Sequence, residues 1–219
     1  MQADSLHCAA QFLIPKVIRK YGLRSQPGFL PTPVSVPDYV TKAKRPTVCF
    51  VSRWDSRKKP EDFFALASAF PQVDFIAVGE SADVERDRML RDIASRIPNL
   101  ELTGVIDQFQ GDRLQEVFGK SWILANASPR EGLPNTFIEA AANRCAILSR
   151  LNPDGFASRF GYHAADHDLA AGLKALLAND RWRTMGERGY EYVNRTFEMS
   201  VAVDAHLRVY GQVMQRARA

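Results

Sequence analysis

The sequence has few cysteines, and their spacing excludes the usual disulfide and zinc arrangements. Cys8, Cys49 and Cys145 are the only three, and they lie far apart. An odd number of cysteines at wide spacing is neither a disulfide framework nor a zinc pattern. Cys49 and Cys145 fall inside apolar runs, where cysteine behaves as a small hydrophobic residue. We therefore interpret the cysteines as structural and expect a cytoplasmic protein.

Long apolar runs and strong charge of one sign are also missing. No run could span a bilayer, and Asp4, His7 and Gln11 interrupt any secretory signal at the N-terminus. The net charge of +4 suits anionic ligands or peripheral attachment at the inner membrane face, but it is too small to indicate nucleic-acid binding. A Walker loop, a G-x-G-x-x-G fingerprint and a Ser-His-Asp nucleophile elbow are absent. We predict no nucleic-acid partner and no transmembrane segment.

From Thr47 onward, short apolar runs alternate with amphipathic segments. We expect strands at 47–51, 73–78, 100–103, 122–125 and 145–149, and helices at 61–70, 83–97, 112–119 and 137–142, followed by a helical tail at 166–177, 181–195 and 200–216. Near-continuous apolar strands separated by helices predict a parallel sheet covered on both faces. The fold class is therefore α/β, a doubly wound Rossmann-like domain over 46–180 with C-terminal helices over 181–219 packing on it.

Residues 1–45 have a different pattern. Residues 6–21 have helix-compatible apolar spacing, although Pro15 should kink or break that helix. Pro31, Pro33 and Pro37 predict an extended chain that is poor at forming central strands. The segment is too short to be a domain and is interpreted as a connector that arrives from elsewhere.

Two carboxylates, Glu131 and Glu139, stand eight positions apart across a strand-to-helix junction. With Thr136 as N-cap, we expect Glu131 on the loop and Glu139 in the first helical turn. Such loops open onto the crevice at the carboxyl ends of parallel strands, and a helix start attracts phosphate. A phosphate site beside two acceptors for hydroxyl groups suits a nucleotide-sugar. Alternatively, Thr136-x-x-Glu139 is a capping box that only stabilises the helix, and Glu131 is a solvated acid.

A second group of candidates follows the strand at 47–51. Arg53 and Lys58 should face the same crevice as Glu131, and a guanidinium fork with an ammonium charge suits a pyrophosphate. The alternative is a solvated basic loop, since residues 53–59 contain four cations. His163 and His167 are spaced i, i+4, but no carboxylate or cysteine pattern completes a metal site, so we interpret them as solvated or locally hydrogen-bonded.

At these motifs the chain resembles the retaining glycosyltransferases of the GT-B class, group 1 (family four). The run Glu131-Gly132-Leu133-Pro134-Asn135-Thr136-Phe137-Ile138-Glu139-Ala140 is similar to the family's E-G-x-P/G-x-x-x-x-E-A element. The run 53–61 looks like its basic loop, Val78-Gly79 like its second-strand glycine, and 98–104 like its pn-v-f-G segment. The resemblance covers about residues 47–178.

The resemblance implies a role for each matching position. Arg53, Lys58 and Glu131 would be catalytic: the two cations hold the donor pyrophosphate and neutralise the departing diphosphate, and Glu131 contacts the sugar ring. Glu139 would accept hydrogen bonds from the ribose hydroxyls. The other implied donor-binding positions are Val105, at the nucleobase, and Gly132, Leu133, Pro134, Asn135 and Thr136, around the sugar and distal phosphate. The implied reaction is glycosyl transfer with retention from a UDP- or GDP-sugar through an oxocarbenium-like transition state, without a metal or other cofactor.

The chain departs from the family pattern at two points. Ser52 stands where the family usually has glycine, and one Rossmann-like domain is present where GT-B enzymes have two. The resemblance therefore implies a C-terminal donor-binding half, with 1–45 as the end of the acceptor domain plus the linker. We expect an acceptor-domain partner or self-association through the inter-domain face. The alternatives are a non-catalytic nucleotide-sugar-binding module, a nucleotide-sugar epimerase and a Rossmann-like interaction protein.

Overall fold

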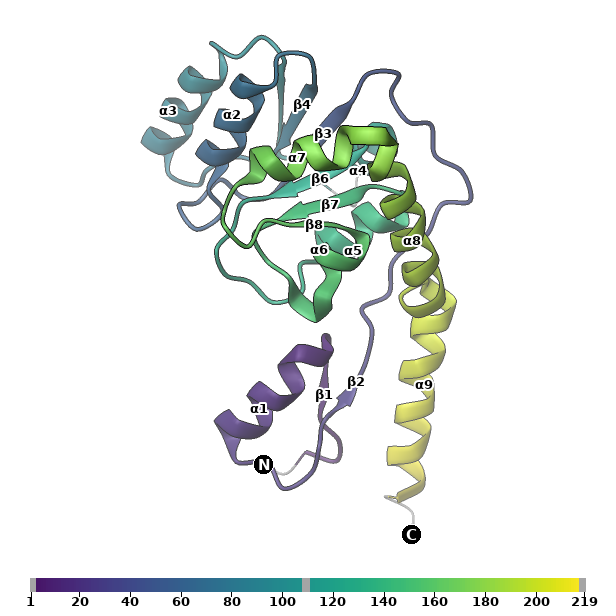
Figure 1. The fold of residues 1–219 in the computed structure, drawn as a ribbon. Helices are drawn as coiled ribbons and strands as arrows, with labels where there is room; N and C mark the ends of the chain where they lie inside the picture. The colour runs from purple at the N-terminus through teal and green to yellow at the C-terminus, as the bar shows by residue number, and fades with distance from the viewer. Residues whose placement is uncertain (1–2, 108–110, 217–219) are drawn as a thin grey trace.

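The computed structural model describes residues 3–107 and 111–216 (Figure 1). Within these residues, six parallel strands form the central sheet in the order β5-β4-β3-β6-β7-β8. They are β3 (Thr47–Val51), β4 (Asp74–Val78), β5 (Leu100–Gly104), β6 (Ile123–Asn126), β7 (Ala146–Ser149) and β8 (Gly161–His163). The chain builds from β3 to β5 on one side and then returns to add β6, β7 and β8 on the other. The strand order therefore reverses between β3 and β6, and ligands bind at the carboxyl ends of strands at such a switch point.

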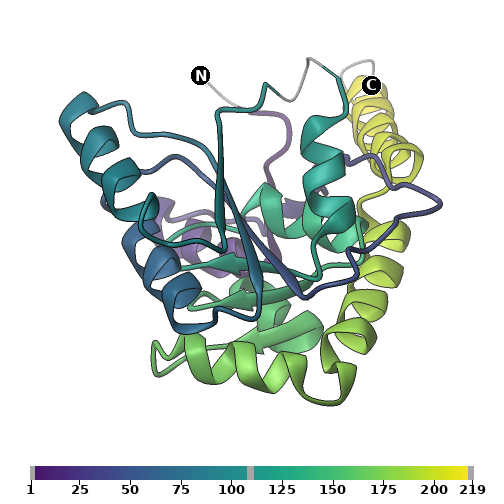
Figure 2. The same cartoon turned by 90° about the horizontal axis from the view of Figure 1, so that it is seen from above.

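Helices cover both faces of the sheet, as Figure 2 shows from above. One face packs against α2 (Pro60–Ala69), α3 (Val84–Ala94) and α7 (Leu169–Leu177), and the other against α4 (Arg113–Lys120), α5 (Asn135–Ala142) and α6 (Phe156–Phe160). Helix α8 (Arg181–Thr196) contributes Trp182 to the first layer and Val193 to the second. The chain ends in α9 (Met199–Arg216). The predicted doubly wound α/β class with a helical tail is confirmed.

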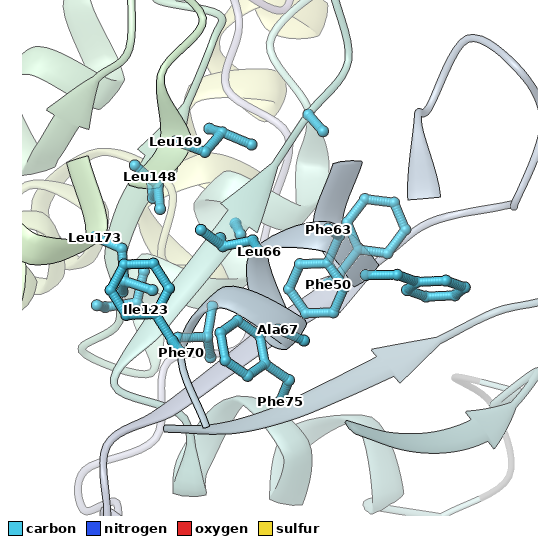
Figure 3. Packing of buried hydrophobic residues seen from close by; sticks show 14 of the residues in the cluster. Phe50, Phe63, Leu66, Ala67, Phe70, Phe75, Ile123, Leu148, Leu169 and Leu173 are labelled. Carbon is cyan, nitrogen blue, oxygen red and sulfur yellow. The ribbon is translucent and has the colours of Figure 1, made fainter. Parts of the chain in front are cut away.

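Aromatic packing fixes α2 against the sheet (Figure 3). The ring of Phe63 on α2 stacks on Phe50 of β3 with centroids 5.1 Å apart, and it meets Phe75 of β4 edge-on at 5.4 Å. All three side chains are buried. Aromatic pairs contribute about 0.5–1.5 kcal/mol beyond the burial of their area. This packing places the loop between β3 and α2, which carries Arg53 and Lys58.

The end of β4 requires glycine. Gly79 has φ +128°, and a Cβ built there would lie 1.9 Å from the carbonyl oxygen of Ser52. The loop after β3 therefore passes against the β4 backbone more closely than any side chain allows. This close approach explains why a glycine stands at position 79, where the resemblance had placed the second-strand glycine.

The N-terminal unit, residues 3–30, forms a small element of its own. Strand β1 (His7–Cys8) pairs in parallel with β2 (Gly28–Phe29), and α1 (Ile14–Tyr21) follows a 3-10 turn. The apolar spacing over 6–21 does not give one continuous helix: of the kink or break expected at Pro15 the structure has the break, because residues 11–13 form the 3-10 turn and the α-helix begins at Ile14. Pro15 lies in the first turn of α1, where its missing N–H has no helical partner to lose.

Two chain segments connect the N-terminal unit and α9 to the main domain, and they lie side by side. The N–H of Val34 donates to the carbonyl of Phe197 at 2.8 Å, and Val34 forms a parallel bridge with Glu198. A third link comes from Asp154, after β7, whose carboxylate accepts hydrogen bonds from the backbone N–H groups of Gln11 and Phe12 at 2.9 and 2.6 Å. Helix α9 and the N-terminal unit line a common cavity.

Further along the connector, Lys42 anchors the chain beneath the sheet. Its ammonium group donates to the carbonyl oxygens of Ser121, Phe118 (3.3 Å) and Asn143 (2.6 Å). These carbonyls end α4 and α5, where the helix dipole favours a cation. The connector is therefore held at both Val34 and Lys42.

The structure also corrects the predicted starts of two helices and adds one strand that was not predicted. Helix α5 begins at Asn135 with Pro134 as its N-cap, so Thr136 is not the cap and Glu139 lies beyond the first turn. Pro134 (φ −66°, ψ 132°) keeps the chain extended up to that point, and no side chain caps the helix. The capping-box alternative was therefore wrong. Strand β8 was missed because it has three residues and no apolar run, and the helix expected from residue 166 begins at Leu169, with Asp168 as its N-cap.

Candidate functional site

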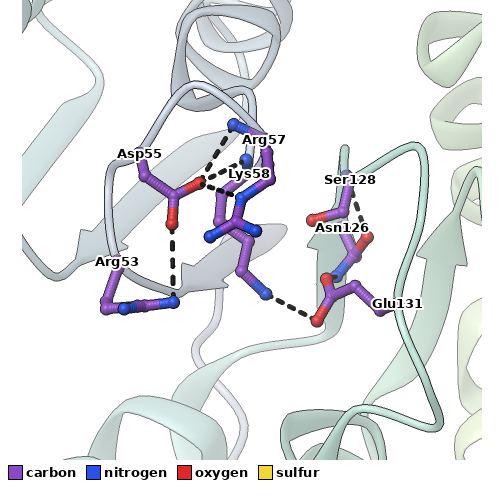
Figure 4. A network of polar contacts seen from close by, with 7 residues as sticks. All are labelled: Arg53, Asp55, Arg57, Lys58, Asn126, Ser128 and Glu131. Atoms are coloured by element: carbon purple, nitrogen blue, oxygen red, sulfur yellow. Dashed lines mark hydrogen bonds and ion pairs between the residues drawn. The ribbon is translucent and has the colours of Figure 1, made fainter.

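The carboxyl ends of β3 and β6 bring Lys58 and Glu131 into contact (Figure 4). The Nζ atom of Lys58 lies 2.5 Å from Oε2 of Glu131, and the two side chains are only 21% and 16% exposed. Asn126, the last residue of β6, donates its side-chain amide to Oε1 of Glu131 at 3.0 Å. Both oxygens of the carboxylate therefore have a donor, and the pair lies at the switch point of the sheet.

The electrostatics of this pair keep Glu131 ionised. Burial alone would raise the pKa of Glu131, but hydrogen bonds from Lys58 and Asn126, together with the charge of Lys58, hold that pKa below its usual value. An ammonium group has three donors, so Lys58 can bind an anionic ligand while it keeps its contact with Glu131.

Arg53 lies beside this pair on the same loop and is much more exposed. Its side chain is 77% exposed and its guanidinium lies 3.6 Å from Oδ2 of Asp55, a surface contact of little energy. The other oxygen of Asp55 accepts hydrogen bonds from the backbone N–H groups of Arg57 and Lys58 at 3.0 and 3.2 Å. Asp55 was not among the predicted site residues, although an aspartate that bonds N–H groups two and three residues later is a known turn signal.

Two cavities flank the start of α5, and together they are lined by five of the predicted residues. One has a volume of about 460 Å³ and is lined in part by Arg53, Val105 and Thr136. The other has a volume of about 380 Å³ and is lined in part by Asn135 and Glu139. Helix starts expose N–H groups that attract anions, and α5 presents such a start between the two cavities. The predicted residues thus surround one helix terminus.

Glu139 faces the smaller cavity as a partly buried carboxylate. Burial raises its pKa, and no residue in the described part of the chain donates a hydrogen bond to its side chain. A desolvated carboxylate without donors is suited to accept hydrogen bonds from hydroxyl groups of a ligand. The residues Leu114 and Gln115 of α4 form the opposite side of this cavity.

The loop between Glu131 and α5 is held by its apolar residues. Leu133 packs against the core on the α4, α5 and α6 face of the sheet, and Pro134 is the N-cap of α5. Gly132 is exposed, and a Cβ built there would have nothing within 4 Å. His163 lies in β8, and His167 is near the start of α7. Across residues 3–107 and 111–216, no group of three or more His, Cys, Asp or Glu side chains could hold a metal ion.

Fold and site together define an α/β protein whose crevice combines an anion-binding helix start, two cations and two carboxylates. The family model for the glycosyl transferases group 1 matches residues 45–179, more than half of the chain, and the chain belongs to that family. Among curated proteins, none is similar enough in sequence to count as a relative.

Solved structures share the fold at low sequence identity. Sucrose-phosphate synthase from Thermosynechococcus elongatus superimposes with a TM-score of 0.78 at 20% identity, over 98% of this chain and 59% of that one. The pneumococcal O-GlcNAc transferase GtfA, solved with UDP and GlcNAc, gives 0.74 at 16% identity, over 97% and 46%. HepE from Anabaena, solved with UDP-glucose, gives 0.77 at 12% identity, over 96% and 64%. The fold is the GT-B type, and the chain spans roughly half the length of the structures it matches.

Proposed function

We propose that this chain is the donor-binding half of a retaining glycosyltransferase that uses a nucleoside-diphosphate sugar. The observation that carries the proposal is the contact between Lys58 and Glu131 at the switch point of the sheet. A diphosphate requires cations that can replace its water, and a sugar requires hydrogen-bond acceptors nearby. The crevice offers both kinds of group beside the start of α5.

Each residue has a defined role in the proposed reaction. Lys58 and Arg53 bind the diphosphate and stabilise the negative charge that develops on it as the glycosidic bond breaks. The N–H groups at the start of α5 bind the distal phosphate. Glu139 accepts hydrogen bonds from the ribose hydroxyls, and Glu131 contacts the sugar ring. No step requires a metal, and we keep the prediction that none is used.

The solved relatives support a nucleotide-sugar as the ligand. GtfA was solved with UDP and GlcNAc and HepE with UDP-glucose, so the fold accommodates a uridine diphosphate in both and the intact nucleotide-sugar in HepE. We therefore propose a uridine diphosphate sugar first and a guanosine diphosphate sugar second. Val105, which lines the same cavity as Arg53, is the proposed contact for the nucleobase.

The acceptor side of the reaction requires a further domain. The chain spans roughly half the length of the structures it matches, and α9 exposes an apolar stripe to solvent. The stripe consists of Met199, Val203, Leu207, Tyr210 and Met214. In this proposal residues 46–180 bind the donor, α8 packs on them, and 1–45 together with α9 contact an acceptor domain or a second copy. The alternative is a nucleotide-sugar-binding module that transfers no sugar by itself.

The cellular location is part of the same proposal. The three cysteines are free and buried, which favours a reducing compartment such as the cytoplasm. None of the helices in the described residues has the length and apolar character needed to cross a membrane.

Calorimetric titration tests the proposal directly. The purified chain is titrated with UDP, GDP, ADP and their common sugar conjugates. We expect saturable binding of one nucleotide, with loss of binding in Arg53→Ala and Lys58→Ala. Arg45→Ala is the matched control, because Arg45 forms an exposed ion pair with Asp74 at the amino end of the sheet. Absence of binding by every nucleotide would refute the donor-site assignment.

A further inference from the structure

The first turn of α2 is held by two arginines that approach it from different sides. Glu61 and Asp62 are adjacent acids in that turn. Arg86 of α3 pairs with Glu61 and donates its Nε–H to the carbonyl of Trp54 at 2.9 Å. Arg150, the residue after β7, pairs with Asp62. The start of α2 is therefore tied to both sides of the sheet's switch point.

Arg150 makes the connection that crosses this switch point. The same Nη1 that pairs with Asp62 also donates to the carbonyl of Ala127 at 3.2 Å, and the side chain is only 17% exposed. Ala127 directly follows Asn126, whose amide donates to Glu131 at 3.0 Å. One guanidinium thus joins the start of α2 to the strand end that holds Glu131.

We propose that Arg150 is a positioning residue for the donor site. By bridging Asp62 and the carbonyl of Ala127, it sets the distance between the start of α2 and the end of β6, across which Lys58 contacts Glu131. Lys58 lies four positions before Asp62 on the same loop-helix junction, so a movement of α2 moves both. The inference rests on the proposed function for its effect on ligand binding. Arg150 acts through the other two side chains and not on the ligand.

The chemistry of the guanidinium suits this role. Nη1 holds the carboxylate of Asp62 and the carbonyl of Ala127, and Nη2 donates to the carbonyl of His167 at 3.3 Å, so the rigid planar group is fixed from two of its nitrogens, which the single ammonium of a lysine on a flexible stem does not reproduce. Misplacement of a binding group by about 1 Å can cost a hundredfold in rate. The Lys58–Glu131 contact is 2.5 Å long, so a small shift of α2 would open it.

The test uses the full chain and two readouts. Arg150→Met should raise the proton affinity of Glu131 roughly threefold or more, measured by a ¹³C carboxyl NMR titration, because Lys58 moves away. The same variant should weaken nucleotide binding about tenfold in calorimetry. Arg150→Lys should not restore either value. Asp62→Asn, at a more exposed position, should shift both in the same direction and guards against a failure of Arg150→Met to fold.

A matched control is available at the end of α3, where Arg96 follows the helix. Arg96→Met removes the ion pair with Asp92, whose side chains are 73% and 61% exposed, and should leave both readouts unchanged. An unchanged Glu131 titration in both Arg150→Met and Asp62→Asn would overturn the inference, even if the variants lose stability. A shifted titration in a chain whose wild type binds no nucleotide would support the positioning role and refute the proposed function.

Discussion

Replacing Lys58 by Met should destabilise the chain, because it leaves the largely buried carboxylate of Glu131 without its cation. Removing one partner from a buried ion pair costs roughly 3–5 kcal/mol. The side chains of Lys58 and Glu131 are 21% and 16% exposed, and Asn126 still donates to Glu131 in the variant. The expected cost in the free energy of unfolding at pH 7 is therefore lower, about 2 kcal/mol. For a chain of this length that corresponds to a fall in Tm of roughly 4–8 °C.

The pH dependence of this cost follows from the pKa of Glu131, which the folded state holds below its usual value of 4.5. A depressed carboxylate pKa contributes stability above the unfolded value and loses it as the pH falls through the folded value. The difference between wild type and Lys58→Met should therefore be full at pH 7 and disappear at strongly acidic pH.

Urea unfolding, followed by tryptophan fluorescence at several pH values, measures this free energy. The double variant Lys58→Met/Glu131→Gln should recover most of the loss, because no unpaired charge remains buried. A single variant that costs less than about 0.5 kcal/mol at pH 7, or a double variant no more stable than the single one, would refute the reasoning.

Three further predictions concern other parts of the chain. Glu139→Gln should raise the free energy of unfolding at neutral pH but not at pH 4, because burial raises the pKa of Glu139 and its charged form opposes folding as the pH rises through the folded pKa. The nucleotide affinity of the same variant should fall about tenfold, and an unchanged affinity would exclude the ribose role. Gly79→Ala should cost about 3 kcal/mol in urea unfolding, since its Cβ would lie 1.9 Å from the Ser52 carbonyl, and a loss below about 1 kcal/mol would contradict the close approach. Burial raises the thiol pKa of Cys49 and Cys145, so neither should react with a disulfide reagent at pH 8 before unfolding in urea, and rapid labelling of the native chain would disprove this.

The alternation of apolar strands and helices made the fold class predictable from the sequence. It also placed the loops after the strands at 47–51 and 122–125 at one crevice, because parallel strands share their carboxyl edge. What the sequence could not show is the pairing of Lys58 with Glu131, which are 73 positions apart. Such a contact depends on the register and twist of the sheet between them.

Local preference also failed where one residue outweighed its neighbours. Thr136 is a favoured N-cap residue, yet Pro134 caps α5 and the helix starts at Asn135. Pro15 was expected to kink or break a helix over 6–21, and the α-helix begins only at Ile14, with Pro15 in its first turn. Arg150 had no local signal at all, since its partners Asp62 and Ala127 are brought to it only by the folded sheet.

The paired crossing at Val34 has a mechanical consequence. Both segments that leave the main domain, the connector and the chain entering α9, pass through one hydrogen-bonded point at Val34 and Phe197. The N-terminal unit and α9 are therefore attached to the main domain at one shared place, and a change at Val34 would affect both attachments. The carboxylate of Asp154 provides a second, separate attachment, so the N-terminal unit cannot turn about Val34 without breaking the hydrogen bonds from Gln11 and Phe12.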